Sequence, residues 1–238
     1  MTWLFYILYF HETNYMKKAL RIFVSLLMTT ILVAMTTQRS QRIIFFGDSI
    51  TQAAIQPGGY ITILQQDLKQ KGRASDYELI GAGIGGNKVY DLFLRLEKDV
   101  LQQKPDKVVI YIGVNDVWHK QLAGTGTDPD KFKLFYATII EKIQASGAKV
   151  ILCTPAVIGE RTDHSNQQDG DLNAYSSIIR TLAAAYKCPL VDLRKAFLVY
   201  NLEHNKENKE QGILTTDRVH LNETGNALVA QEMAKVLF

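Results

Sequence analysis

Short apolar runs and longer amphipathic runs alternate along the chain after residue 36. The apolar runs are rich in Ile and Val and are bounded by Gly, Pro or Asp. Their hydrophobicity is continuous, which is typical of strands buried on both faces of a parallel sheet. Five strands are therefore predicted, at residues 42–47, 77–83, 107–113, 149–155 and 189–193.

The segments between these strands have helical periodicity. Helices are predicted at residues 60–72, 89–103, 130–147, 172–187 and 223–236. Repeated strand–helix alternation predicts an α/β fold, a helix–sheet–helix sandwich with right-handed crossovers around about five parallel strands. Two longer loops are expected, around 117–130 and 156–171, and long loops in such a domain often bind ligands or act as lids. No linker divides the chain, so residues 37–238 are predicted to form one domain.

The first 36 residues have a different pattern. A short cationic segment at 16–21 precedes a 14-residue apolar run at 22–35, and small polar residues follow. This layout predicts a secretory signal peptide, since 14 residues are too few to span a bilayer comfortably. Met16 is the expected start, which makes residues 1–15 an upstream extension. The mature protein is expected to be periplasmic or extracellular without a stable membrane span; an uncleaved anchor or a buried core helix are the alternatives.

The composition of the chain bears on which ligands and partners it is expected to bind. The chain has 238 residues, 47% hydrophobic and 21% charged, which is ordinary for a globular protein. Without residues 1–36 it carries 24 basic and 23 acidic residues and no basic run, which argues against a nucleic-acid partner. Cys153 and Cys188 lie in apolar contexts, where two buried thiols are favoured over a disulfide. Neither has partners at metal-ligand spacing, so no metal site is predicted.

Candidate chemistry follows the predicted strands, because open parallel sheets bind ligands beyond the carboxyl ends of their strands. The first strand runs into Gly47, Asp48 and Ser49. A serine becomes a nucleophile only when a base takes its proton and donors stabilise the oxyanion that it creates. Alternatively, Asp48 and Ser49 cap a helix or close a turn.

The second and third strands end in glycine-rich and amide-bearing segments. "GAGIGG" at 81–86 fits the dinucleotide pattern G-x-G-x-x-G, but it follows the second strand and has no convincing ribose-binding acid, so a nucleotide site is a weak alternative. "GVND" places Asn115 after the third strand, where its amide can serve an oxyanion hole or form a turn. His119 follows closely and is expected to line the cleft.

Asp217 and His220 are three positions apart in "TTDRVHLNETGN". On one helical turn they would project toward the same side, so that the carboxylate orients the imidazole and the other ring nitrogen faces a serine. Asn222 is a predicted cap of the last helix, and a chance surface pair is the alternative. Together, the nucleophile, the donors and the Asp–His pair on four segments predict a serine hydrolase.

These four segments resemble the SGNH hydrolases, the GDSL esterase/lipase family. "FFGDSIT", "GIGGNKVYD", "IGVND" and "DRVH" resemble its blocks I, II, III and V, in order, and lie within residues 42–225. The serine motif is GDSI rather than GDSL, and Asn87-Lys88 stands where many members have Asp-Thr. The G-x-S-x-G elbow of α/β-hydrolases is absent around Ser49.

The resemblance implies a flavodoxin-like, three-layer α/β/α fold and no metal or cofactor. It implies Ser49 as the nucleophile and Asp217 and His220 as its partners. The implied oxyanion donors are the N–H of Ser49, the N–H of Gly86 (with Gly85 as a neighbouring candidate) and the amide of Asn115. Asp48, Asn87 and His119 are expected to contact substrate.

The implied activity is cleavage of small-molecule or glycan carboxylic esters through an acyl-enzyme. A carbohydrate acetyl esterase is favoured by the expected export and by the polar loop 156–171. A lysophospholipase or lipase-like acylhydrolase is the first alternative, and a non-catalytic binding module on the same fold is the second.

Overall fold

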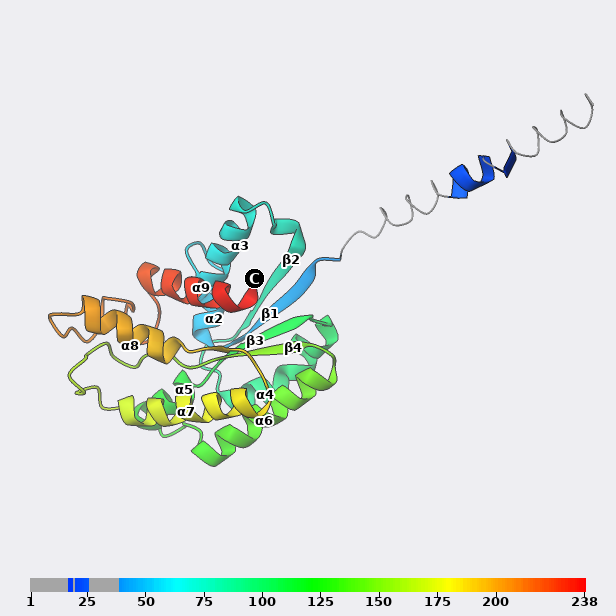
Figure 1. The fold of residues 1–238 in the computed structure, drawn as a ribbon. Helices are drawn as coiled ribbons and strands as arrows, with labels where there is room; N and C mark the ends of the chain where they lie inside the picture. Colours follow the sequence, from blue (N-terminus) through cyan, green and yellow to red (C-terminus); the bar gives the residue numbers. More distant parts are fainter. Residues whose placement is uncertain (1–16, 19, 26–38) are drawn as a thin grey trace, which may run out of the picture. The chain divides into compact units, whose positions relative to one another are not determined.

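The computed structural model describes residues 17–18, 20–25 and 39–238 (Figure 1). The chain divides between Arg39 and Ser40 into two units, and the folded unit is Ser40–Phe238. Residues 17–18 and 20–25 are helical, whereas most of the predicted signal peptide lies outside the described residues. Within the described ranges, no helix has both the length and the apolar character needed to cross a lipid bilayer.

A five-stranded parallel sheet forms the centre of the folded unit, in the order β2-β1-β3-β4-β5. This confirms the α/β class and the five predicted strands. The strands are β1 (Gln41–Gly47), β2 (Tyr77–Gly83), β3 (Lys107–Tyr111), β4 (Lys149–Cys153) and β5 (Leu190–Val191). Strand β1, an interior strand between β2 and β3, is buried on both faces from Ile43 to Phe46, which explains its unbroken apolar sequence.

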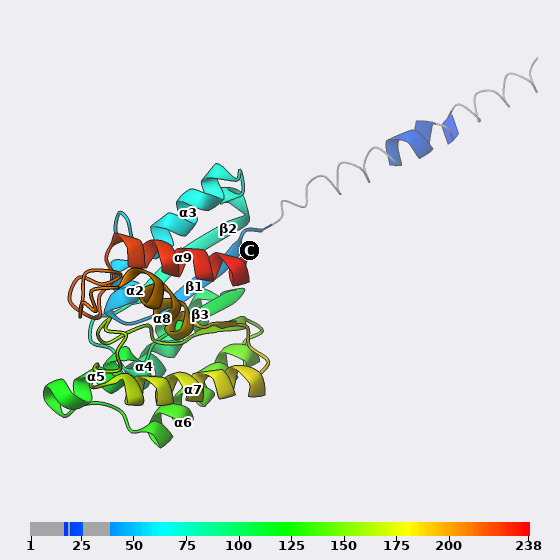
Figure 2. The same cartoon turned by 60° about the vertical axis from the view of Figure 1, so that its left-hand side comes forward.

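Helices cover the sheet in two layers (Figures 1 and 2). One layer contains α3 (Tyr60–Gln70) and α9 (Glu223–Leu237), with α8 (Leu193–His204) beside α9. The other layer contains α4 (Val89–Asp99), α6 (Pro129–Ala145) and α7 (Asp169–Ala185). Short 3₁₀ helices span Ala74–Asp76 and Leu101–Gln103. The three-layer α/β/α sandwich is therefore as predicted.

Three helices were not predicted: α2 (Ser49–Ala53), α5 (Val114–Ala123) and α8. The prediction of a loop over 117–130 was wrong in its first half, which α5 occupies. Helix α5 buries only its first turn, and α8 leaves Leu198, Val199 and Leu202 exposed, so neither shows one clear apolar stripe. Helix α2 has five residues, too few for periodicity to show.

Both cysteines are free and buried, as expected for two thiols: Cys153 ends β4 and Cys188 lies just before β5. Burial raises the pKa of both thiols, so they are poor nucleophiles.

The topology determines where a ligand can meet the sheet. The chain passes from β1 to β2 on one side and then crosses to β3 on the other side of β1. The end of β1 therefore lies at the point where the strand order reverses, with Gly47 paired to Gly83 of β2 and Tyr111 of β3. Parallel α/β sheets bind ligands at this point.

Candidate active site

Ser49 is the first residue of α2 and follows β1 after a sharp turn. The turn depends on Gly47, because a Cβ there would lie 2.3 Å from Thr51 Oγ1 and 2.4 Å from the carbonyl oxygen of Tyr111. Asp48 caps α2, and its Oδ1 accepts a hydrogen bond from the N–H of Ile50 at 3.0 Å. The hydroxyl of Ser49 thus lies just beyond the end of β1, on a turn held by close packing.

A chain of hydrogen bonds links three of the predicted residues. Ser49 Oγ lies 2.9 Å from His220 Nε2, and His220 Nδ1 lies 2.7 Å from Asp217 Oδ2. Because the carboxylate only accepts, Nδ1 carries the proton and Nε2 is free to accept from the serine. The structure therefore brings together Ser49, His220 and Asp217 in the geometry of a nucleophile, its base and the group that orients the base.

Asp217 and His220 lie on a tight turn rather than on the expected helical turn. An antiparallel bridge between Thr215 and Leu221 closes it, and Thr216 N–H donates to the carbonyl of His220 at 2.8 Å. Asp217 Oδ1 accepts from the N–H of His220 at 2.8 Å, so the carboxylate holds both the backbone and the ring of the same residue. The predicted cap of α9 is confirmed, since Asn222 Oδ1 accepts from the N–H of Gly225 at 2.9 Å.

The loop after β2 presents a backbone N–H near the nucleophile turn. Gly86 has φ +75°, in the left-handed region that favours glycine, and Asn87 N–H closes the turn on the carbonyl of Ile84 at 3.3 Å. The N–H of the neighbouring Gly85 donates to Gln52 Oε1 at 2.7 Å. This engagement of Gly85 favours Gly86 as the donor to a ligand.

Asn115 lies in the first turn of α5 and is 2% exposed. Its Nδ2 donates one hydrogen bond to the carbonyl of Asn87, at 3.1 Å. A side-chain amide carries two N–H groups, so one remains for a ligand. The N–H of Ser49, in the first turn of α2, has no acceptor within its own helix. Three donors thus lie on the segments that follow β1, β2 and β3.

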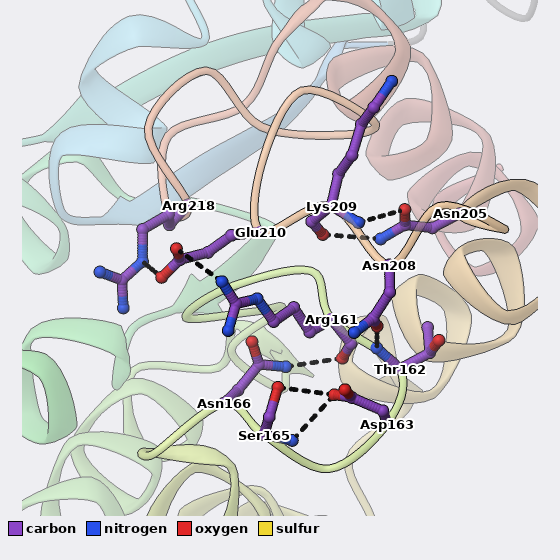
Figure 3. Close-up of polar contacts among 10 residues, drawn as sticks. All are labelled: Arg161, Thr162, Asp163, Ser165, Asn166, Asn205, Asn208, Lys209, Glu210 and Arg218. Atoms are coloured by element: carbon purple, nitrogen blue, oxygen red, sulfur yellow. Dashed lines mark hydrogen bonds and ion pairs between the residues drawn. The ribbon is translucent and has the colours of Figure 1, made fainter.

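Two loops hold the Asp217–His220 turn through a polar network (Figure 3). The carboxyl group of Glu160 is 1% exposed and accepts from the N–H groups of Ile213 and Leu214, at 2.8 and 2.7 Å. Glu210 forms ion pairs with two arginines (Figure 3). Its Oε2 lies 3.4 Å from Nη2 of Arg161, and its Oε1 lies 2.9 Å from Nε of Arg218. The predicted loop 156–171 is confirmed up to residue 168, and α7 begins at Asp169. This loop supports the turn that carries His220.

Further contacts tie these loops together. Gly159 N–H donates to the carbonyl of Arg218 at 2.9 Å, and Asn205 Nδ2 donates to the carbonyl of Glu160 at 2.8 Å. Thr162 N–H donates to Asn208 Oδ1 at 2.8 Å (Figure 3). The turn is thus supported by hydrogen bonds and ion pairs between loops rather than by a strand.

Two buried carboxyl groups, Asp48 and Asp116, lie beneath the site. Burial raises the pKa of Asp48 to about 7, although the hydrogen bond from Ile50 opposes the shift. Burial likewise raises the pKa of Asp116 to about 6, although the hydrogen bond from the N–H of Val89 opposes the shift. Asp48 is 2% exposed, and its carboxyl group caps α2 through the N–H of Ile50, so a contact with substrate stays a prediction.

Asp217 has the opposite shift. Partial burial raises its pKa, but hydrogen bonds from the N–H and ring of His220 and from the N–H of Val219 outweigh this effect, so the pKa lies below its ordinary value. Asp217 therefore stays ionised at neutral pH, as a carboxylate that orients an imidazole must.

The other two residues expected to contact substrate, His119 and Asn87, differ in how far their side chains are already engaged. His119 is half-buried on α5, four residues after Asn115, and desolvation lowers its pKa, helped by the charge of Lys88. Trp118, also half-buried, has its ring centroid 6.2 Å from that of His220 and 5.7 Å from that of His119. Asn87 uses its side-chain oxygen to accept from Arg95, so that oxygen is already engaged. A substrate contact by His119 stays a prediction.

The dinucleotide alternative does not fit the structure. Gly83 is needed for packing, because a Cβ there would lie 2.1 Å from the backbone nitrogen of Gln52 in α2. At the start of α4, where a phosphate would bind, the N–H of Val89 already donates to the carboxyl group of Asp116. In the part of the chain that the structure describes, no group of three or more His, Cys, Asp or Glu side chains could hold a metal ion.

Sequence reasoning missed several residues that shape the site: Gln52, Arg95, Asp116, Trp118 and Glu160. Most of them act on backbone groups of other loops, which no local pattern reveals. Asp116 and Trp118 gave a usable signal, since both lie within three residues of Asn115 after a predicted strand.

Comparison with known proteins agrees with this geometry. The model of the GDSL-like lipase/acylhydrolase family matches residues 45–228. The crystal structure of the acetyl xylan esterase AlAXEase is 62% identical, covers 83% of this chain and 100% of its own, and superposes with a TM-score of 0.82.

Curated relatives are more distant. An acetylxylan esterase from Geobacillus stearothermophilus is 26% identical over 209 residues, which are 80% of this chain and 91% of the relative. Esterase TesA from Pseudomonas aeruginosa is 30% identical over 166 residues, which are 67% of this chain and 74% of the relative. The chain therefore belongs to the GDSL-like lipase/acylhydrolase (SGNH) family and is an esterase of that family.

Proposed function

We propose that this esterase removes acetyl groups from a carbohydrate, such as an acetylated xylan, through an acetyl-enzyme on Ser49. The hydrogen-bond chain from Ser49 through His220 to Asp217 is the observation that carries the chemistry. The 62% identity to an acetyl xylan esterase supports the substrate class. The expected absence of a cofactor is consistent with this chemistry, which needs none.

In the first half-reaction, His220 Nε2 takes the proton of Ser49 as Oγ attacks the ester carbonyl carbon. Asp217 holds the ring in the required tautomer and stabilises the imidazolium that forms. The tetrahedral intermediate collapses when His220 gives its proton to the leaving sugar oxygen. The acyl group remains on Ser49 as an ester.

In the second half-reaction, a water molecule replaces the sugar. His220 takes a proton from the water as its oxygen attacks the acyl-enzyme carbonyl, and then returns that proton to Ser49 Oγ. In both steps the N–H of Ser49, the N–H of Gly86 and the Nδ2 of Asn115 hold the negative oxygen. Such donors act mainly on the transition state, where the charge develops.

The aromatic group beside the base supports a carbohydrate ester. Trp118 and His119 follow Asn115 on α5, and the rings of Trp118 and His220 meet in a T-shaped contact. Aromatic rings give sugars an apolar surface to stack on and give a short acyl group a wall.

Acyl-chain profiling tests the substrate class. The purified protein is assayed with p-nitrophenyl esters from acetate to palmitate, and acetate release from acetylated xylan is measured with Ser49→Ala as the control. We expect kcat/KM to be highest for acetate and to fall as the acyl chain lengthens. A maximum at long chains would overturn the carbohydrate proposal and favour the lipase-like alternative, while unchanged hydrolysis by Ser49→Ala would overturn the triad itself.

The same protein is proposed to act outside the cytoplasm. This rests on the sequence alone: the cationic residues at 16–21 precede an apolar run of 14 residues. Expression of the full chain in a bacterium, followed by fractionation and N-terminal sequencing of the product, tests it. We expect a mature N-terminus close to residue 37. An uncleaved product in the membrane fraction would support the anchor alternative.

A further inference from the structure

Arg95 lies on α4, and its side chain is only 13% exposed. Its guanidinium spans the ends of two strands: one Nη donates to the carbonyl of Gly47 at 2.7 Å, and the other donates to the carbonyl of Ala82 at 3.0 Å. Asp99, one turn later, accepts from the same group at 2.9 Å. The group also lies over the ring of Phe46, 4.5 Å from the centroid.

The remaining nitrogen of Arg95 reaches the oxyanion loop. Its Nε donates to Asn87 Oδ1 at 2.7 Å. Asn87 directly follows Gly86, and its own carbonyl accepts the hydrogen bond from Asn115 Nδ2. One side chain therefore fixes the residue that adjoins one donor and orients another.

The hydrogen bond from Arg95 to the carbonyl of Gly47 adds a contact near the third oxyanion donor, because Gly47 lies two residues before Ser49. Arg95 thus binds Gly47, two residues before Ser49, and Asn87, which follows Gly86 and accepts from Asn115. Arginine suits the task because its planar group offers five donors in a fixed geometry, whereas lysine offers a single mobile ammonium.

We infer that Arg95 is a positioning residue for the oxyanion hole, holding the Ser49, Gly86 and Asn115 donors at their mutual spacing. The inference rests on the proposed acyl-transfer function. Displacement of a donor by about 1 Å can cost about 10²-fold in rate, and such a loss falls on kcat when the donor acts in the transition state.

Arg95→Met tests this, because methionine keeps the apolar stem but removes every donor. We expect kcat for p-nitrophenyl acetate to fall by about 10- to 100-fold, with KM changed less than about threefold. Arg95→Lys is expected to recover only part of the loss.

Arg42→Met is the matched control. Arg42 also joins β1 to β2, through Glu78 at 2.8 Å, but at the opposite end of the strands. We expect its kcat to stay within about twofold of the unmodified enzyme, even where its melting temperature falls as far as that of Arg95→Met.

A double-mutant cycle with Asn115→Ala separates positioning from general loss of structure. If Arg95 acts in part through Asn115, the fall in kcat of the double variant is smaller than the product of the two single falls. Losses that multiply in full, or an unmodified kcat in folded Arg95→Met, would overturn the inference.

If Arg95→Met does not fold, Asn87→Ala takes its place in the same cycle, with Asn87→Asp, which keeps the oxygen acceptor, as its conservative partner. A smaller loss of kcat in Asn87→Asp than in Asn87→Ala supports the inference, and equal losses refute it. None of these results bears on the proposed function, which is overturned instead by an active Ser49→Ala variant or by a maximum of kcat/KM at long acyl chains.

Discussion

The two halves of the candidate site are held by different kinds of structure. Ser49, Gly86 and Asn115 follow three adjacent strands, and the strand beneath Ser49 is buried from Ile43 to Phe46. Asp217 and His220 lie on a turn outside the sheet, which polar loops support. Figure 3 shows the contacts of these loops, including the ion pair at Arg218. Packed strands deform little, whereas hydrogen-bonded loops open at lower free energy. Substitutions in the strand-borne half should therefore lower kcat directly. Substitutions that weaken the loop-borne half should first make the Asp217–His220 turn less ordered.

The largest effect is expected at the strand-borne nucleophile. Ser49→Ala removes the attacking oxygen while leaving the cap of α2 intact, because Asp48 and not Ser49 forms that cap. We expect kcat to fall by about 10⁴- to 10⁶-fold while the melting temperature changes little. Steady-state kinetics and thermal denaturation measure the two quantities, and a large fall in melting temperature would contradict this separation of chemistry from packing.

Removal of a strand-borne donor should have the next largest effect. Asn115→Ala deletes the side-chain N–H groups, and we expect a loss in kcat of about 10²- to 10³-fold with a small change in KM. Asn115→Asp is the matched variant: it keeps the size but replaces the donors with an acceptor, so it should be no more active than alanine. Substantial activity in Asn115→Asp would count against an oxyanion role.

On the loop-borne side, Glu160→Gln should weaken the turn without touching the sheet. The substitution places an NH₂ group against one of the N–H groups of Ile213 and Leu214. We expect a destabilisation of about 1–3 kcal/mol, faster amide exchange in residues 211–221 and about a tenfold lower kcat.

Glu210→Gln serves as the control, because its ion pairs are about 40% exposed and should contribute less than about 1 kcal/mol. Equal amide exchange in the two variants would argue that the buried carboxyl group is not the main support of the turn.

The smallest effect on catalysis is expected for Asp48, and its signature is in stability. The folded protein keeps this proton up to about pH 7, whereas an unfolded chain releases it near 3.8. The folded state therefore binds more protons between these values, so the free energy of unfolding falls as the pH rises from about 4 to 7.

Asp48→Asn removes that dependence and keeps an oxygen for the N–H of Ile50. At pH 8 we expect it to be more stable than the unmodified protein by on the order of 1–3 kcal/mol, and at pH 4 to be about equal. Urea denaturation at both pH values measures the difference, with Asp67→Asn on the surface as the control. A uniform offset at both pH values would show that titration is not the cause.

The strand-borne half of the site was largely predictable from sequence, because strands leave a local hydrophobic pattern that loops do not. Buried parallel strands need unbroken apolar runs, and polar residues follow where the strands end, so Ser49 and Asn115 were placed at the strand ends by local pattern. Their catalytic roles were predicted only from the combination with Asp217 and His220. The pairing of Asp217 with His220 was also predicted, but the expected helical turn was wrong. Spacing of three residues suits both a helix and a turn in which the Asp side chain caps the backbone.

The supporting residues could not be predicted in the same way. Arg95 contacts Gly47, which is 48 positions away in the sequence, and Glu160 contacts Leu214, which is 54 positions away. Helix α4 gave a partial signal, since Arg95 adjoins the buried Leu96 and lies three residues after the buried Leu92. The partner of such a residue depends on the tertiary fold and not on a local period.

The bridge between Thr215 and Leu221 closes the Asp217–His220 turn into one local unit of seven residues. The carboxylate of Asp217 binds the backbone and the ring of His220 within these seven residues, while the neighbouring loops hold the turn as a whole in place. Lengthening or shortening residues 205–211 would move the base toward or away from Ser49 as one piece. The reach of the base can thus be altered by loop length while the hydrogen bonds between Asp217 and His220 are kept.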